Sequence, residues 1–297
     1  MLKSILLTII SVLVYYSILL LLYLFDVIWS LVFLVFLLYG IIIVGVLFLV
    51  FLKNSSLKKS FGASIVLLSI LFAYEFLLLF DTSAPAYSVK NYIPPHESIA
   101  GSGIYSVGIG EIDYDKKDSK ELIHKVLTEQ GVDVLSITKI DNMMIYGAKN
   151  RQLLSWLHLR KEYSSKEMVE TVQDYLGNEM DWVLNWDKEG ISGHSAGLSL
   201  ALSGLYNRGD FENHIPIAVT GGINKDGKVT KVGGIKEKLQ IIDKAEISIA
   251  LLPTKNKREA EKLRKEMKSK VSIFYVSDVK EAQRKIEELN LKHKAAQ

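Results

Sequence analysis

The stretch IPIAVTGGINKDGKVTKVGGIKEKLQII, residues 215–242, contains the signals of a strand, a hairpin and a helix in succession. Residues 215–223 are a largely apolar run, which is typical of a buried strand. Residues 224–227 (NKDG) end in the Asp-Gly pair of a tight turn, and the chain returns through 229–232. Apolar residues then recur at helical spacing over 236–244. This order predicts a domain in which strands and helices share one core.

Strands and helices continue to alternate downstream of this stretch. The patterns predict a buried strand at 247–252, a charged helix at 257–268, a strand at 271–276 and a last helix that Ser277 or Asp278 caps. The carboxyl-terminal half therefore has the alternation that is typical of an α/β arrangement.

Weaker patterns occupy the chain between residues 100 and 189. Alternation predicts strands at 104–112, 132–140 and 143–146, and helical spacing predicts helices at 120–129 and 165–175. Together with the downstream elements, these patterns predict an α+β or α/β domain with mixed strand pairing.

The first 80 residues hold three long apolar runs, at 5–25, 27–52 and 62–80. At about 1.5 Å per residue, each run would cross a hydrocarbon core of about 30 Å as a helix. Lys3 before the first run raises the alternative of a signal peptide, but the apolar stretch is too long and no A-x-A-like cleavage site follows. We therefore expect three transmembrane helices.

Charges around the apolar runs predict their orientation. Lys53, Lys58 and Lys59 lie between the second and third runs, whereas the first turn holds only Asp26. Because cytoplasmic loops carry the excess of Lys and Arg, this loop and Lys3 are expected inside the cell. Three crossings then place the rest of the chain on the extracytoplasmic side of the cell membrane.

Four parts are expected along the chain: a membrane anchor at 1–80, a proline-containing linker at 81–99, a soluble domain at 100–290 and a polar tail at 291–297. Glu75 is the one ionisable residue well inside a predicted span. It either reaches a neighbouring helix or the interface, or it takes part in recognising intramembrane substrates.

Composition excludes several kinds of site. The chain has no cysteine, which rules out a cysteine nucleophile, thiolate metal sites and disulfides. Outside the spans, basic and acidic residues nearly balance, so the charge predicts no nucleic-acid binding, and the Lys-rich segments 255–270 and 280–292 are interpreted as solvated helix faces. Residues 222–229 nearly match a phosphate loop, but the motif ends in Val229 and joins two predicted strands. We expect no cofactor, metal, nucleotide or nucleic acid.

A candidate nucleophile lies in GISGHSAGLSLAL, residues 190–202. Ser195 occupies the middle of a G-x-S-x-G pattern, and a helix is predicted at 196–205. An α/β-hydrolase esterase would need an acid and then a histidine downstream of this serine. Only His214 and His293 follow, the first directly before a strand and the second in the polar tail. The α/β-hydrolase alternative is therefore disfavoured.

A lysine is the other candidate base for Ser195, provided that burial lowers its pKa enough to keep the amine neutral. Lys238 shares a face of its predicted helix with apolar residues at i−3, i+1 and i+4. Lys236 and Glu237 are expected to point toward solvent. Taken alone, the pattern also fits an edge lysine whose charged end reaches water.

The motifs GHSAG at 193–197, VTGG at 219–222 and GGIKEK at 233–238 resemble, in this order, those of the proteolytic domain of the Lon protease family. The resemblance is close over 190–260 and extends to about 290. It implies an α+β Lon-type domain with a Ser-Lys dyad that hydrolyses peptide bonds, and a homo-oligomer, a hexamer in the relatives. The roles that it implies are Ser195 as nucleophile, Lys238 as general base, Thr220 as the residue that orients the lysine, and Gly193 and Ala196 as the backbone oxyanion region.

Three positions depart from the family pattern. His194 stands where the family usually has proline or an acid, Ser192 where many members have Asp, and Gly222 where the common version has Glu. These departures concern substrate preference and activity level more than the Ser-Lys pair.

We therefore expect a membrane-tethered, ATP-independent serine endopeptidase that cleaves unfolded, membrane or exported proteins. Protein or peptide substrates, membrane lipid and further copies of the chain are its expected partners. The alternative is an inactive Lon-like scaffold that only captures peptides. A channel built on the three apolar runs is disfavoured, because Glu75 alone supplies too little polar lining.

Overall fold

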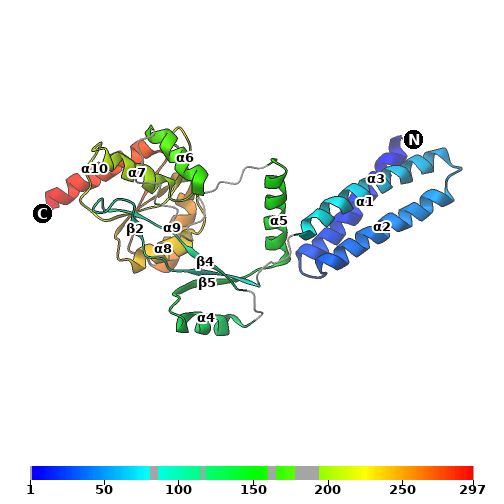
Figure 1. The fold of residues 1–297 in the computed structure, drawn as a ribbon, viewed down its shortest axis with the longest axis horizontal. Helices are drawn as coiled ribbons and strands as arrows, with labels where there is room; N and C mark the ends of the chain where they lie inside the picture. Colours follow the sequence, from blue (N-terminus) through cyan, green and yellow to red (C-terminus); the bar gives the residue numbers. More distant parts are fainter. Residues whose placement is uncertain (1, 81–85, 115–117, 160–164, 178–193, 297) are drawn as a thin grey trace. The chain divides into compact units, whose positions relative to one another are not determined.

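The chain divides into two compact units. The computed structural model describes residues 2–80, 86–114, 118–159, 165–177 and 194–296. One unit combines Met1–Ala86 with Lys139–Lys161, and the other combines Tyr87–Thr138 with Glu162–Gln297. The chain therefore passes between the two units three times (Figure 1).

The first unit is helical. Its apolar helices are α1 (Leu2–Leu24), α2 (Ser30–Val50) and α3 (Ser55–Leu77), and the short 3-10 helix η1 (Leu78–Phe80) follows. Residues 5–24, 30–50 and 55–77 are long and apolar enough to cross a membrane. The expected three apolar helices are confirmed, and they are compatible with a membrane anchor.

The third apolar helix begins earlier than its hydropathy predicts. The Asn54 side chain accepts hydrogen bonds from the backbone N–H groups of Ser56 and Leu57, and it thereby caps α3 at its first turn. The predicted start at residue 62 is wrong because a capping signal, rather than the first apolar residue, sets the helix start. Lys58 and Lys59 consequently lie within the helix.

A fourth helix, α5 (Asn142–Trp156), also belongs to this unit. The predicted strand at 143–146 is wrong, because Asp141 caps a helix there by accepting from the Met144 N–H at 2.8 Å. A short apolar run does not by itself separate strand from helix. Residues 139–161 thus group with the N-terminal helices, although the sequence suggested one continuous domain from 100 to 290.

The second unit is built on a five-stranded mixed sheet in the order β10-β9-β6-β3-β2. Strands β3 (Ile104–Ser106), β6 (Ile217–Val219), β9 (Ile249–Pro253) and β10 (Ser272–Val276) are parallel, and β2 (His96–Glu97) pairs antiparallel with β3. The mixed α/β fold class is confirmed.

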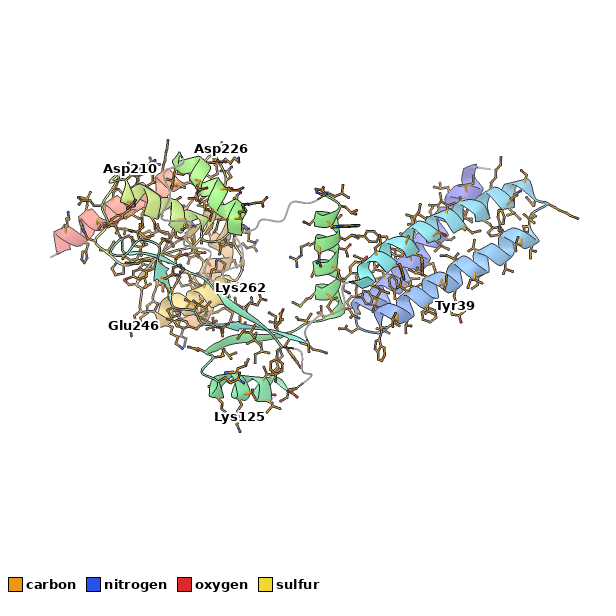
Figure 2. The ribbon with its side chains drawn as sticks, viewed as in Figure 1. Tyr39, Lys125, Asp210, Asp226, Glu246 and Lys262 are labelled. Carbon is orange, nitrogen blue, oxygen red and sulfur yellow. The ribbon has the colours of Figure 1, made fainter. Side chains whose placement is uncertain are left out.

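Helices cover both faces of this sheet. One face packs against α6 (Ser165–Leu176), α7 (Gly197–Asn207) and α10 (Val279–Ala296), and the other against α8 (Ile235–Lys244) and α9 (Lys257–Met267) (Figure 1). A 3-10 turn, η3 (Thr254–Asn256), precedes α9. All three residues of β6 are buried, since its successive side chains enter opposite cores. On α9, Lys262 projects into solvent (Figure 2).

Two smaller sheets complete the unit. Strands β4 (Gly110–Tyr114), β1 (Tyr87–Asn91) and β5 (Val134–Lys139) form one of them. Against this sheet packs α4 (Lys120–Glu129). The other is the hairpin of β7 (Gly222–Ile223) and β8 (Val229–Thr230), as the Asp-Gly turn predicted.

Two expectations for the region before residue 115 differ from the structure. The predicted strand 104–112 is divided into β3 and β4, which belong to different sheets. Gly110 begins β4 and pairs with Asn91 of β1, whose side-chain oxygen would lie 2.4 Å from a Cβ at this position. The segment suggested as a linker, 81–99, contains β1 and β2.

Candidate active site

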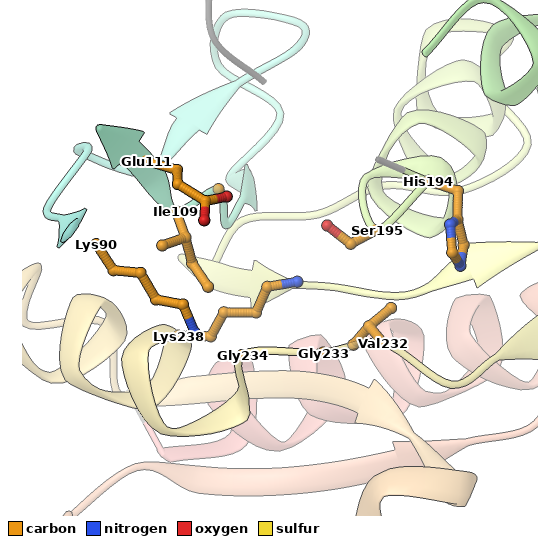
Figure 3. A pocket seen from close by; sticks show the side chains of 10 residues that line it. Lys90, Ile109, Glu111, His194, Ser195, Val232, Gly233, Gly234 and Lys238 are labelled. Atoms are coloured by element: carbon orange, nitrogen blue, oxygen red, sulfur yellow. The ribbon is translucent and has the colours of Figure 1, made fainter. Parts of the chain in front are cut away.

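A cavity of about 250 Å³ in the α/β unit brings together side chains that are distant in sequence (Figure 3). Ser195 lies before α7, Lys238 lies on α8, and Lys90 and Glu111 come from β1 and β4. Ser195 and Lys238 were the predicted nucleophile and base. The structure thus places both of them on the wall of one pocket.

The Ser195 loop is fixed to the end of β6 by two backbone hydrogen bonds. The Gly221 N–H donates to the Ser195 carbonyl at 2.7 Å, and the Leu198 N–H donates to the Gly221 carbonyl at 2.8 Å. A Cβ at Gly197 would lie 3.2 Å from the Ile223 backbone nitrogen. The Ser195 loop therefore approaches β7 this closely because residue 197 is glycine. Ser195 is therefore held at the start of α7.

Lys238 is the buried cation of the pocket. Its residue is only 3% exposed, and its Nζ donates to Thr220 Oγ1 at 2.7 Å. Burial disfavours the charged amine and lowers the pKa of Lys238 from 10.5 to about 7. Lys238 is thus a buried residue rather than an edge lysine whose charged end reaches water.

Thr220 connects the lysine to the serine loop. It follows the carboxyl end of β6, is fully buried, and donates from its hydroxyl to the Ser195 carbonyl at 3.3 Å while it accepts from Lys238. Figure 3 shows the Ser195 hydroxyl and the Lys238 amine pointing into the same space. A hydroxyl and a largely neutral amine in one cavity are the groups that base-assisted nucleophilic attack requires.

The loop that leads into α8 has its own supports. Gly234 adopts a left-handed φ of +67°, and a Cβ there would lie 2.4 Å from the Ile109 side chain. The buried Asn256 side chain accepts from the Val232 N–H at 3.0 Å and donates to the Val232 carbonyl at 2.9 Å. These contacts fix where α8 begins and hence where Lys238 lies. Sequence reasoning assigned Asn256 no role, although Asn256-Lys257-Arg258 fits the N-K-[RK] part of the family pattern.

Glu237 does not point toward solvent as the sequence suggested. It is buried, and its carboxylate accepts from Lys90 Nζ at 2.9 Å and from Ser136 at 3.2 Å. Burial acts to raise the pKa of Glu237, but the hydrogen bonds and the Lys90 charge outweigh it and lower that pKa overall. The prediction was wrong because Lys90, which covers the Glu237 carboxylate, lies on β1. Helical spacing gives no information about contacts from another segment.

Sequence reasoning also missed Glu111, a carboxylate that lines the pocket. Glu111 lies directly opposite Lys90 in the β1–β4 register and accepts from the Ser88 hydroxyl at 2.6 Å. Alternation within the predicted strand 104–112 was the available signal, but it did not identify the facing strand.

His194 and Gly222, two residues that depart from the family pattern, lie next to each other in the structure. A Cβ at Gly222 would lie 2.4 Å from His194 Cδ2, so the histidine side chain occupies the room that a larger residue 222 would need. Ala196 is buried at the N-terminus of α7. Gly193 and Ser192 lie outside the described residues.

Comparisons with known proteins converge on one family. Residues 188–287 match the Lon protease (S16) C-terminal proteolytic domain. A Lon protease of Syntrophomonas wolfei is 30% identical over 214 residues, which cover 66% of this chain and 24% of that protein. A Lon protease of Aquifex aeolicus is 37% identical over 90 residues, covering 30% of this chain and 11% of that protein. The chain thus spans about a quarter or less of the length of these relatives.

Proposed function

Residues 188–287 form a Lon-family proteolytic domain, and on that premise we propose that this chain is a membrane-tethered serine endopeptidase with a Ser-Lys dyad. The observation that carries the proposal is the buried Lys238 amine, which points with the Ser195 hydroxyl into one cavity. Its pKa of about 7 leaves a large neutral fraction near neutral pH.

In the first half of the reaction, neutral Lys238 takes the proton from Ser195 Oγ as the oxygen attacks the carbonyl carbon of a peptide bond. The tetrahedral intermediate collapses when protonated Lys238 gives that proton to the departing amine nitrogen. The C–N bond breaks, and the carbonyl carbon stays bound to Ser195 as an ester. In the second half, Lys238 takes a proton from water, the hydroxide attacks the ester, and the proton returns to Ser195 Oγ.

Backbone N–H groups at Ser195 and Ala196 are the proposed oxyanion donors. They lie at the N-terminus of α7, where N–H groups lack helical partners and the helix dipole favours negative charge. Gly193, which the family resemblance adds to this region, belongs to the residues that the structure leaves out. Thr220 positions the amine by accepting its hydrogen bond.

Membrane tethering is supported by α1, α2 and α3. With Lys53, Lys58 and Lys59 on the cytoplasmic side, the proteolytic domain would face outward.

Lon-family proteases act on protein substrates and oligomerise, so we propose unfolded, membrane or exported proteins as substrates and a hexameric homo-oligomer. For ATP independence, the support is that residues 222–229 form a strand-to-strand hairpin, whereas a phosphate loop leads from a strand into a helix.

The test uses the full chain in detergent micelles with fluorescein-labelled casein as an unfolded substrate, without nucleotide. Ser195→Ala and Lys238→Ala should abolish cleavage and labelling by a fluorophosphonate, whereas the exposed neighbour Lys236→Ala should retain both. If casein binds but wild type and Ser195→Ala cleave equally little, the chain is a peptide-binding scaffold and the protease proposal fails.

A further inference from the structure

Helix α5 carries an interaction surface that the proteolytic function does not use. In sequence it lies between β5 and α6 of the α/β unit, yet it packs with the apolar helices of the other unit. Within that unit it runs across one end of the α1–α3 bundle (Figure 1). Its place raises the question of what it contacts on its remaining faces.

Hydrogen bonds fix the N-terminal part of α5 to the turn between α1 and α2. The Asn142 side chain donates to the Tyr23 carbonyl at 2.8 Å, and the Asn142 N–H donates to Asp26 at 3.2 Å. Trp29, which follows this turn, is 79% exposed. Tryptophan is enriched where a membrane span meets the headgroup region. α5 therefore begins at the depth where the first two spans leave the hydrocarbon.

Glu75 fixes the same helix from the other side. The Tyr146 hydroxyl of α5 donates to Glu75 Oε1 at 2.8 Å, and the Tyr16 hydroxyl of α1 donates to the same oxygen. A side-chain hydrogen bond also joins Tyr74 of α3 to Asn150 of α5. Glu75 is buried, so the carboxylate in the third span holds α1, α3 and α5 together.

The outward side of α5 is apolar and basic. Trp156 is 69% exposed and Leu159, just after the helix, is 73% exposed, and two methionines near its N-terminus are also exposed. Arg151 is exposed, Lys149 is half-buried beside Glu75 and Tyr146, and residues 142–159 contain no Asp or Glu. An exposed tryptophan at the end of the spans is typical of the membrane–water interface.

We propose that α5 lies in the headgroup region of an anionic bilayer, at the leaflet reached by the α1–α2 turn. Trp156 and Leu159 enter the boundary of the acyl chains, and Arg151 contacts lipid phosphates. The charge of the helix favours anionic lipid over a neutral surface. This interface rests on the membrane tether alone and is independent of the Ser195 chemistry.

The test places a single tryptophan at position 156. The full chain with Trp29, Trp182 and Trp186 changed to Phe is reconstituted in phosphatidylcholine–phosphatidylglycerol vesicles. Lipids brominated near the headgroup should reduce Trp156 emission about twofold or more, whereas aqueous iodide should reduce it little. A reference chain that keeps only Trp29 reports the depth of the α1–α2 turn, and circular dichroism confirms that the single-tryptophan chains are folded.

A charge test accompanies the depth test. Replacing phosphatidylglycerol by phosphatidylcholine should shift Trp156 toward iodide, and Arg151→Gln should remove that lipid dependence. Lys125→Gln, on the α/β unit (Figure 2), is the matched control. Strong iodide quenching in anionic vesicles would overturn the proposal, and so would protection from both quenchers, which would indicate a protein partner or a second copy over α5.

Discussion

Replacing Lys238 by methionine should make the protein more stable and inactive at once. The shift of its pKa from 10.5 to about 7 means that the unfolded chain binds a proton there more tightly than the folded chain. At about 1.4 kcal/mol per pKa unit, the buried amine destabilises the fold by about 4 kcal/mol at pH 7. Methionine is similar in length and apolar, so it removes this penalty without opening a large cavity.

The net gain is smaller than the full penalty, because the hydrogen bond to Thr220 is lost. That bond contributes about 1 kcal/mol, and Thr220 keeps its contact with the Ser195 carbonyl. We therefore expect Lys238→Met to stabilise the α/β unit by roughly 3 kcal/mol at pH 7, which raises its melting temperature by about 5–10 °C. Casein cleavage should disappear.

The pH dependence gives the sharper check. Because the folded-state pKa lies below the unfolded one, the unfolded chain holds more protons between about pH 7 and 10.5, and wild-type stability rises with pH across that window. The stability of Lys238→Met lacks this pH-dependent contribution. Its gain in stability over wild type is therefore largest at pH 7 and below and is smaller at pH 9. Thermal unfolding of the full chain in detergent, followed by circular dichroism at both pH values, measures the difference.

Lys236→Met is the control, since Lys236 is exposed on the same helix. Two results would refute the reasoning about the buried amine. One is a melting temperature of Lys238→Met at pH 7 that is no higher than that of Lys236→Met. The other is an advantage that does not change between pH 7 and pH 9. Retained cleavage by Lys238→Met would contradict its role as base.

Three further changes test other parts of the structure. Thr220→Val should lower the cleavage rate about tenfold or more, because the amine of Lys238 loses its positioning bond, and Thr220→Ser should restore it; equal rates for both variants in a casein assay would contradict this role. Gly222→Glu should lower the melting temperature, because a Cβ there would lie 2.4 Å from both His194 Cδ2 and Thr230 Oγ1. Added His194→Ala should recover part of the loss, and no recovery would contradict the clash with His194. Glu75→Ala should speed trypsin cleavage at Lys149 by releasing α5, at a cost of about 1–3 kcal/mol, whereas unchanged digestion would show that its two tyrosine contacts do not hold the helix.

Local patterns identified most of the carboxyl-terminal half. The run at 215–223, the Asp-Gly turn and the spacing of α8 were sufficient to predict the strand, hairpin and helix that now surround the site. The face of α8 that carries Lys238 could also be predicted, because apolar neighbours at helical spacing bury whatever stands among them. The order of residues disfavoured a histidine partner for Ser195, and the resemblance to the Lon family, added to the apolar face of the helix, favoured Lys238.

Partners from distant segments could not be predicted in the same way. Glu237 is one residue from Lys238 and lies outside the apolar stripe, but Lys90 and Ser136 from another sheet cover it. The segment at 143–146 is a short apolar run that fits a strand, yet a cap and the contacts to Glu75 make it part of α5.

The sequence by itself therefore determined the three apolar helices, the order of the proteolytic-type elements and the candidate pair Ser195 and Lys238. Only the tertiary structure decided that Asn256 fixes the loop before α8, that Glu237 is buried and that α5 packs with the apolar helices. The physical reason is that hydropathy and spacing report which side of a segment avoids water, whereas a pKa or a hydrogen bond depends on the atoms that cover that side.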